Sequence, residues 1–249
     1  MTVEIDGETR LVALLGHPVS HSLSPRMQNA AFAARALNWA YVALDVAPER
    51  LEQAVSGLEA LGFVGANVTI PHKRAVALLC DELDEDAARA GSVNTLVFRD
   101  GRLYGSSTDG LAVTGAIAPA TRAVVLGVGG SARAAIAALE HAGTDVRVHT
   151  RSGDWPPRAD DADLVVNATP VKDELLVEPR AHQQVVDLAY NADGSPTALV
   201  AAARAAGCAT VVDGLEVLVR QGAASFERWT GMVAPLEVMR AALDLRSGG

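Results

Sequence analysis

Residues 121–142, TRAVVLGVGGSARAAIAALEHA, are the segment that most constrains the fold of this chain. The short apolar run at 123–126 is typical of a buried parallel strand, and the residues from Ala132 onwards place apolar side chains at helical spacing. Between them, Gly127, Gly129 and Ala132 fit the pattern G-x-G-x-x-G/A. A strand, a glycine turn and a helix in this order predict a dinucleotide-binding unit.

Each small residue of this pattern has a physical reason. Gly127 permits a tight turn, Gly129 lets the backbone approach a pyrophosphate, and Ala132 lets the helix pack closely on the strand. Free N–H groups at the helix start would face the phosphates. The alternative is an ordinary glycine turn of an α/β sheet. The flanking strand and helix favour the ligand-binding interpretation.

The end of the next strand indicates which dinucleotide binds. An NAD site usually carries an acidic residue there, but this strand ends in Thr150, Arg151 and Ser152, with Asp145 before the strand and Asp154 after the turn. An arginine flanked by hydroxyls suits a 2′-phosphate, so we expect NADP. The alternative is a solvated arginine in a loop.

Bulk composition excludes several classes of protein. A chain of 249 residues can hold one large or two modest domains, and its net charge of −9 argues against a nucleic-acid partner. No apolar run approaches membrane-spanning length, and the first residues lack the apolar segment of a signal peptide. Cys80 and Cys208 form no CxxC pair, so we expect free thiols in the cytoplasm. His17 and His21 lie on a proline-containing loop, and we expect no metal site.

Polar residues follow the first apolar strand, at 11–15. Ser22 and Ser24 stand where open α/β sheets place ligands, and their hydroxyls could hold a small carboxylate. For Ser24, which precedes Pro25, plain capping of the following helix is the alternative.

A second polar group follows the strand predicted at 63–68. Asn67, Thr69 and Lys73 gather where that strand meets a helix predicted from Pro71 through Cys80. Lys73 and Lys172 are the two lysines in a chain with 21 basic residues, and a lysine, unlike an arginine, can give up its proton when partly desolvated. A solvated lysine is the alternative, although a cation in the first turn opposes the helix dipole.

The remaining pattern predicts an α/β fold of two domains. The first comprises residues 1–108 and is rejoined by a final helix within 234–249, and the second comprises residues 109–233. The segment 153–161 is too short for a full crossover helix. We expect the active site in the cleft between the domains.

Taken together, these motifs resemble the shikimate dehydrogenase family nearly from end to end. The motifs that carry the resemblance are HSLSP at 21–25, NVTIPHK at 67–73, GSVNT at 91–95, TDG at 108–110, GVGGSARA at 127–134 and GLEVLVRQ at 214–221. The resemblance implies a substrate domain with a mainly parallel sheet, a C-terminal Rossmann domain, and NADPH-linked reduction of 3-dehydroshikimate to shikimate in aromatic amino-acid synthesis.

The resemblance also implies roles for individual residues. Lys73 and Asp109 match the catalytic pair. The matching substrate-binding residues are Ser22, Ser24, Asn67, Thr69, Asn94, Tyr190 and Gln221. The matching cofactor-binding residues are Gly127, Val128, Gly129, Gly130, Ser131, Ala132, Thr150, Arg151, Ser152, Thr169, Leu188, Gly214 and Glu85. The chain departs from the family's usual residues at Gln28, Pro170-Val171-Lys172 and Val217.

Other functions stay open on the sequence. An NAD-dependent quinate/shikimate dehydrogenase would have an acid at the strand end where Arg151 stands. A catalytically silent protein that binds NADP or a metabolite would have lost Lys73 or Asp109, and both are present. A dinucleotide-dependent enzyme acting on a folate fits the fold, but the serine pair favours a hydroxylated carboxylate. We expect a small-molecule substrate and a monomer or homodimer.

Overall fold

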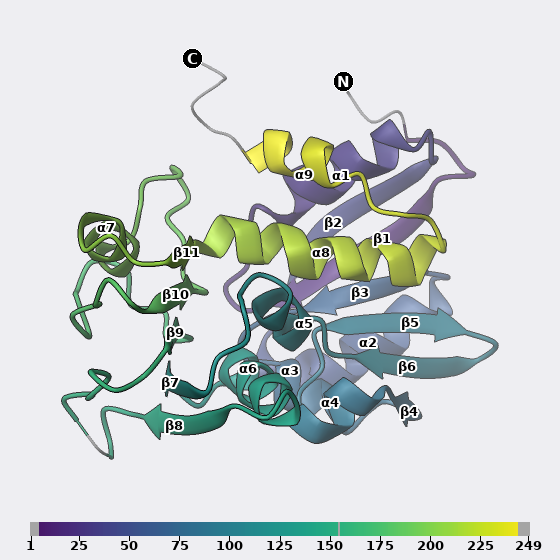
Figure 1. The fold of residues 1–249 in the computed structure, drawn as a ribbon. Helices are drawn as coiled ribbons and strands as arrows, with labels where there is room; N and C mark the ends of the chain where they lie inside the picture. Colours follow the sequence, from purple (N-terminus) through teal and green to yellow (C-terminus); the bar gives the residue numbers. More distant parts are fainter. Residues whose placement is uncertain (1–4, 154, 244–249) are drawn as a thin grey trace. The chain divides into compact units, whose positions relative to one another are not determined.

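The computed structural model describes residues 5–153 and 155–243, which form two compact units. The first unit holds the described residues up to Thr108 and from Val219 onwards, and the second runs from Asp109 to Leu218. Each unit has its own sheet with helices packed on it (Figure 1). Helix α8 (Gly214–Thr230) contributes residues to both units.

The first unit is built on a six-stranded sheet. In spatial order its strands are β2 (Trp39–Asp45), β1 (Arg10–Gly16), β3 (Gly65–Val68), β5 (Thr95–Arg99), β6 (Arg102–Ser106) and β4 (Glu82–Leu83). Strand β1 runs parallel to β2 and β3, β5 runs antiparallel to β3 and β6, and β4 runs parallel to β6. Leu15 pairs with Val68, so the carboxyl ends of β1 and β3 lie side by side.

Helices cover the first sheet. They are α1 (Ser24–Ala34), the 3-10 turn η1 (Pro48–Arg50), α2 (Leu51–Ala60), α3 (Lys73–Ala77), α4 (Glu85–Ala90), α9 (Leu236–Leu243) and the later part of α8. Helices α1 and α9 pack together (Figure 1). Phe226 of α8 stacks on Phe32 of α1, with ring centroids 5.6 Å apart. A side chain at Gly222 would clash with Met27, so this glycine lets α8 approach α1 closely.

The second unit has a wholly parallel sheet. In spatial order its strands are β11 (Thr210–Val212), β10 (Gln184–Asp187), β9 (Leu164–Asn167), β7 (Arg122–Leu126) and β8 (Asp145–His149). Its helices are α5 (Asp109–Thr114), α6 (Gly130–His141), α7 (Ala198–Ala205) and the start of α8.

Burial on both faces explains the unbroken apolar run of β7. Ala123 and Val125 belong to one apolar core, and Val124 and Leu126 belong to the other. Because the chain leaves β7 to form β8 on one side and β9 on the other, β7 and β9 flank a topological switch point. Ligands of open α/β sheets bind at such a point, beyond the carboxyl ends of the strands.

The predicted α/β class with a Rossmann domain as the second unit is confirmed, one predicted helix needs correction, and one strand was not predicted. Helix α3 is shorter than the helix predicted from Pro71 through Cys80, because Leu78 and Leu79 donate to carbonyls three residues back and tighten the chain into a turn. The two-residue strand β4 was not predicted. As expected, the described residues between β8 and β9 contain no helix.

Candidate active site

The loops after β1 and β3 pack tightly against each other. The Thr69 N–H donates to the carbonyl of Leu15 over 2.8 Å, and the His17 N–H donates to the carbonyl of Ile70 over 3.0 Å. A side chain at Gly16 would clash with the methyl group of Thr69, so glycine is required there. These contacts fix the half-buried Thr69 at the shared carboxyl end of β1 and β3.

The serine pair lies on the loop that leads into α1. The helix begins at Ser24 with Leu23 as its N-cap, so capping, the alternative role for Ser24, is wrong. Instead, the Ser22 hydroxyl accepts a hydrogen bond from the Ser24 N–H over 3.2 Å. Ser24 is buried and Ser22 is half-buried. The two hydroxyl-bearing residues are therefore held next to each other at the start of a helix.

Behind these loops, seven polar side chains of the first unit form one hydrogen-bonded group, which we name the amide–hydroxyl cluster. Its members are Tyr41, Asn67, Asn94, Thr95, Thr108, Gln221 and Ser225. They come from β2, β3, β5, α8 and the segments that flank β5 and follow β6. Buried amides and hydroxyls are costly unless they are paired, so this pairing fixes their positions.

Asn67 is at one end of the cluster. Its side-chain carbonyl accepts a hydrogen bond from the Tyr41 hydroxyl over 2.8 Å. Its amide donates to the Ser225 hydroxyl over 2.9 Å and to the carbonyl of Asn94 over 3.0 Å. Asn67 is thus locked from three segments of the chain, which fixes the rotamer of its amide.

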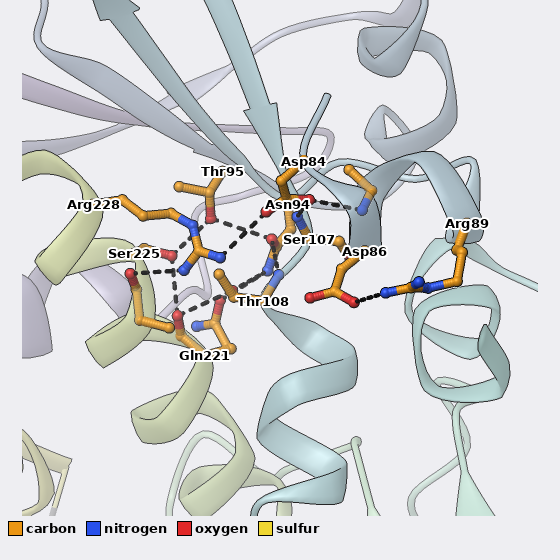
Figure 2. Close-up of polar contacts among 12 residues, drawn as sticks. Asp84, Asp86, Arg89, Asn94, Thr95, Ser107, Thr108, Gln221, Ser225 and Arg228 are labelled. Carbon is orange, nitrogen blue, oxygen red and sulfur yellow. Dashed lines mark hydrogen bonds and ion pairs between the residues drawn. The ribbon is translucent and has the colours of Figure 1, made fainter. Parts of the chain in front are cut away.

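Asn94 and Gln221 meet at the other end of the cluster (Figure 2). The Asn94 amide donates to the Thr108 hydroxyl over 2.8 Å and to the Gln221 carbonyl oxygen over 3.2 Å. In return, the Asn94 carbonyl accepts from the Thr108 N–H over 2.8 Å. Two predicted substrate residues from distant segments therefore lie in contact.

An ion pair supports this end of the cluster. Arg228 of α8 donates to Asp84 over 3.2 Å, and Asp84 also caps α4 by accepting from the Ala87 N–H over 2.8 Å (Figure 2). Both charged side chains are about one-third exposed or less, at 28% and 32%. The pair ties the later part of α8 to the start of α4.

Sequence reasoning missed Ser225, Tyr41 and Thr95. Ser225 is fully buried and contacts both Asn67 and Thr95. A signal for Ser225 existed, because it lies one helical turn after Gln221 and so shares its helix face. Tyr41 sits within an apolar strand and carried no such signal. Thr95 and Thr108 belong to the GSVNT and TDG motifs, but neither was assigned a site role.

Lys73 is the first residue of α3 and is only 8% exposed. Its carbonyl accepts a hydrogen bond from the Val93 N–H over 2.9 Å, which ties the helix start to the segment that carries Asn94. The solvated lysine of the alternative interpretation is therefore wrong. Burial of an ammonium group is costly and is typical of a functional lysine.

Asp109 begins α5 and is also buried, at 6% exposed. The next residue, Gly110, permits close packing of α5 on α6, because a side chain there would press on the backbone of Ala134 and the methyl group of Ala138. The TDG motif thus combines a buried carboxyl group with a glycine needed for helix packing.

The glycine-rich loop of the second unit has the features that a diphosphate requires. Gly127 has a φ of +107°, which disfavours other residues, and Gly129 is the N-cap of α6 with open space where a side chain would be. The N-cap glycine of this twelve-residue helix makes no side-chain cap, and the start of such a helix suits an anion. Ala132 is fully buried against the sheet. Val128 is 55% exposed, and Gly130 and Ser131 begin the helix.

Thr150, Arg151 and Ser152 follow β8 as predicted. The hydroxyls of Thr150 and Ser152 lie 3.4 Å apart. The Arg151 side chain is 62% exposed and donates to Glu174 over 2.8 Å. A guanidinium flanked by two hydroxyls is a donor set that suits a phosphate.

The loops after β9 and β10 hold the remaining cofactor candidates. Thr169 is fixed by Asn167, whose side-chain carbonyl accepts from both the hydroxyl and the N–H of Thr169, over 2.7 and 3.0 Å. Leu188 and Tyr190 follow β10, and Tyr190 lines a small pocket with Gly214. A side chain at Gly214 would clash with the carbonyl of Ala189, so only glycine fits there.

Buried Asp187 joins these two loops. It accepts hydrogen bonds from the Asn167 amide over 2.9 Å, the Ala189 N–H over 2.9 Å and the Thr197 hydroxyl over 2.6 Å. Burial raises the pKa of Asp187 above its ordinary value, although these hydrogen bonds act in the opposite direction. Sequence reasoning did not assign it a role.

Two further positions differ from the rest of the site. Glu85, a cofactor candidate, belongs to the first unit, and its side chain is 90% exposed. Gln28 is fully buried and donates to the carbonyl of Gly222 over 2.9 Å, but its side-chain carbonyl oxygen has no hydrogen-bond partner. Within residues 5–153 and 155–243, no cluster of histidine, cysteine or acidic residues could hold a metal ion, and no helix is long and apolar enough to cross a membrane.

Comparisons with known proteins find relatives over nearly the whole length of the chain. Residues 14–96 match the family model of the shikimate dehydrogenase substrate binding domain, and residues 214–243 match that of the shikimate 5'-dehydrogenase C-terminal domain. A curated relative from Methanopyrus kandleri, named shikimate dehydrogenase (NADP(+)), is 43% identical, with 98% of both chains covered. This chain belongs to the shikimate dehydrogenase family.

Solved structures of shikimate dehydrogenases share the fold. The Thermus thermophilus enzyme in complex with NADP(H) and shikimate has 33% identity and a TM-score of 0.85, with 94% of this chain and 98% of that chain covered. The Listeria monocytogenes enzyme in complex with shikimate and NAD has 27% identity and a TM-score of 0.82, with 98% and 99% covered. The predicted arrangement of a substrate-binding domain and an NADP-binding Rossmann domain is that of the family. Members of the shikimate dehydrogenase family are oxidoreductases.

Proposed function

We propose that this protein catalyses the reversible NADPH-dependent reduction of 3-dehydroshikimate to shikimate. The observation that carries the proposal is buried Lys73 at the carboxyl end of β3, in a chain that matches a relative named shikimate dehydrogenase (NADP(+)) over 98% of its length. The first unit would act as the substrate-binding domain and the second as the dinucleotide-binding domain.

The residues of the first unit suit a hydroxylated carboxylate. Ser22 and Ser24 would hold the carboxylate, and Thr69 with Asn67, Asn94 and Gln221 of the amide–hydroxyl cluster would contact the ring hydroxyls. Tyr190 would add a contact from the second unit. A site of fixed polar groups rejects substrates that lack the matching hydroxyls, because the protein groups would be left unpaired.

The second unit has the donors that NADP needs. The backbone from Gly127 to Ala132 would hold the diphosphate, and Thr150, Arg151 and Ser152 would hold the 2′-phosphate. Thr169, Leu188 and Gly214 would line the cofactor site beyond the diphosphate, and Glu85 would add a contact from the first unit. When bound, the cofactor supplies the hydride that the carbonyl carbon accepts.

The carbonyl oxygen of the substrate must gain a proton as the carbon gains the hydride. We assign this proton to the Lys73 ammonium, which recovers it when the reaction runs in the oxidative direction. Asp109 would orient Lys73 and stabilise its charged form. An arginine could not replace Lys73, since a guanidinium does not give up its proton in proteins.

The test is a matrix of initial rates, followed by NADPH absorbance, with shikimate or quinate paired with NADP or NAD. We expect fast turnover with shikimate and NADP. Fast turnover with quinate or NAD would contradict the proposed specificity and favour an NAD-dependent quinate/shikimate dehydrogenase. If a folded protein binds NADP but turns over no pair, the proposal fails in favour of a silent binding protein.

Two further parts of the proposal concern the setting of the reaction. We propose that the protein works in the cytoplasm as a monomer or homodimer. The free cysteines Cys80 and Cys208 support a reducing compartment, and burial raises the pKa of Cys80 to about 12, which makes its thiol unreactive. Light scattering after gel filtration will distinguish a monomer from a dimer.

A further inference from the structure

The side chain that would bind the 2′-phosphate already has an anionic partner. Arg151, directly after β8, donates through Nη2 to a carboxylate oxygen of Glu174 over 2.8 Å. Glu174 lies 23 residues away, in the loop between β9 and β10. Both side chains are 62% exposed, so they can separate or change partners at little cost.

The residues around the pair include the other donors proposed for the 2′-phosphate. The guanidinium carbon of Arg151 lies 5.9 Å from the ring centroid of half-buried Trp155. The hydroxyls of Thr150 and Ser152 flank Arg151 in the sequence and lie near each other. A phosphate that reaches Arg151 therefore also approaches the Glu174 carboxylate.

We propose that Glu174 is a specificity-determining residue that weakens the preference for NADP over NAD by competing with the 2′-phosphate for Arg151. This inference rests on the proposed function, because it assumes that Arg151 faces the 2′ position of the bound cofactor. Neither the glycine-rich loop nor the catalytic pair is involved, so Glu174 acts on the choice of cofactor alone.

Electrostatics gives the direction of the effect. A 2′-phosphate must displace Glu174 or accept a second anion beside it, and both reduce its affinity. The unmodified ribose of NAD has a hydroxyl at the same position, and this hydroxyl can donate a hydrogen bond to a carboxylate. Glu174 thus weakens the binding of NADP and provides a hydrogen-bond acceptor for NAD.

The size of the effect follows from exposure. Exposed ion pairs contribute little, so loss of the competing carboxylate should raise the affinity for a 2′-phosphate about two- to fivefold. The gain should shrink in high salt, because exposed charges are screened. If Glu174 had a purely structural role, its loss would change the affinity for ligands with and without a 2′-phosphate equally, and the change would not depend on salt.

Calorimetric titration of the full-length protein with 2′,5′-ADP and with 5′-AMP tests the inference, since the two probes differ only in the 2′-phosphate. The variants are Glu174→Gln and, as a matched control, Asp173→Asn, which removes a charge from the neighbouring exposed position. We expect E174Q to raise the affinity for 2′,5′-ADP relative to 5′-AMP two- to fivefold at low salt. D173N should change this ratio much less.

The inference would be overturned if the affinity for 2′,5′-ADP relative to 5′-AMP were the same in E174Q as in the wild type or in D173N. A lowered ratio would also overturn it and would make Glu174 a residue that positions Arg151 for the phosphate. NADP binding to the wild type is measured in parallel. If NADP binds normally and E174Q changes nothing, only the inference fails; if NADP does not bind, the proposed function fails with it.

Discussion

The two regions that would bind substrate and cofactor are built in opposite ways. The amide–hydroxyl cluster of the first unit is largely buried, and its side chains bond to one another across distant segments. In the second unit, the glycine-rich loop offers backbone N–H groups and exposes Val128 at 55%, and Arg151, directly after β8, is 62% exposed. Side chains define the first region, whereas backbone and exposed charge define the second.

Because of this difference, substitutions in the two regions should affect different properties of the protein. Fixed side chains in the first unit are paired before any ligand arrives, so changes there should affect stability together with substrate binding. Backbone donors of a helix N-terminus cannot be removed by substitution of their own side chains. In the second unit, changes should act through loop shape and through charge, and they should appear first in cofactor binding.

The largest expected effect is the loss of turnover when Lys73 is replaced, without a matching loss of substrate or cofactor binding. Replacement of Lys73 by alanine removes the proposed proton donor and should reduce turnover by about 10² or more, with substrate affinity nearly unchanged. Steady-state rates and a direct titration with shikimate measure the two quantities. Arg74→Ala, an exposed cation next to it on α3, is the control and should keep its rate. Normal turnover by K73A would remove Lys73 from the mechanism.

The shape of the cofactor loops is tested at Gly214. Gly214→Ala would push a methyl group into the carbonyl of Ala189, and the overpacking should cost about 1–3 kcal/mol of unfolding free energy and weaken NADP binding. Gly57→Ala in α2 meets nothing within 4 Å and should stabilise the protein by about 0.5–1 kcal/mol. Urea denaturation compares the two. Equal effects at both glycines would show that the contact with Ala189 does not constrain the loop.

The internal pairing of the amide–hydroxyl cluster is tested at Ser225. Ser225→Ala removes one hydrogen-bond partner each from Asn67 and Thr95, which keep their bonds to other members of the cluster. The loss should cost about 0.5–1.5 kcal/mol of unfolding free energy, with weaker shikimate binding as well. The exposed Ser56→Ala on α2 should change stability by at most about 0.5 kcal/mol. Thermal unfolding and a shikimate titration provide the readouts. A stable S225A that binds shikimate normally would contradict a cluster fixed before binding.

A smaller effect concerns pH and the second unit. Burial raises the pKa of Asp187, so the folded protein retains this proton to a higher pH than the unfolded chain. Its contribution to the free energy of unfolding should therefore fall as pH rises from the ordinary value of 3.8 through the raised pKa. Urea denaturation of wild type and Asp187→Asn across this range measures the difference.

Asp163 provides a control of opposite sign for that measurement. Hydrogen bonds from the backbone N–H groups of Arg122 and Thr121 lower the pKa of Asp163. Its stabilising contribution should be present above the ordinary value of 3.8 and lost as pH falls through the lowered pKa. If D187N and D163N showed the same dependence on pH, burial would not dominate at Asp187.

Local patterns predicted much of the fold and several site residues. The glycine spacing around Gly127 and Gly129, set between a strand and a helix, is a property of one short segment and predicted the parallel sheet of the second unit. The scarcity of lysine singled out Lys73, and its burial supports that choice. Both signals need no information from elsewhere in the chain.

Features that depend on distant segments could not be predicted in the same way. Ser225 meets Asn67 across 158 residues, and Glu174 meets Arg151 through a loop with no regular pattern. The early end of α3 depends on a local choice between two turn geometries, which apolar spacing does not decide. In each case the sequence shows a residue of suitable chemistry but does not show its partner.

The composition of the amide–hydroxyl cluster has a consequence for how substrate binding responds to salt. Every member is an amide or a hydroxyl, so the hydrogen bonds between members join neutral groups. These bonds are therefore not ion pairs that salt can screen. A loss of shikimate binding at high salt would then report on charged groups outside the cluster rather than on a change in the shape of the scaffold.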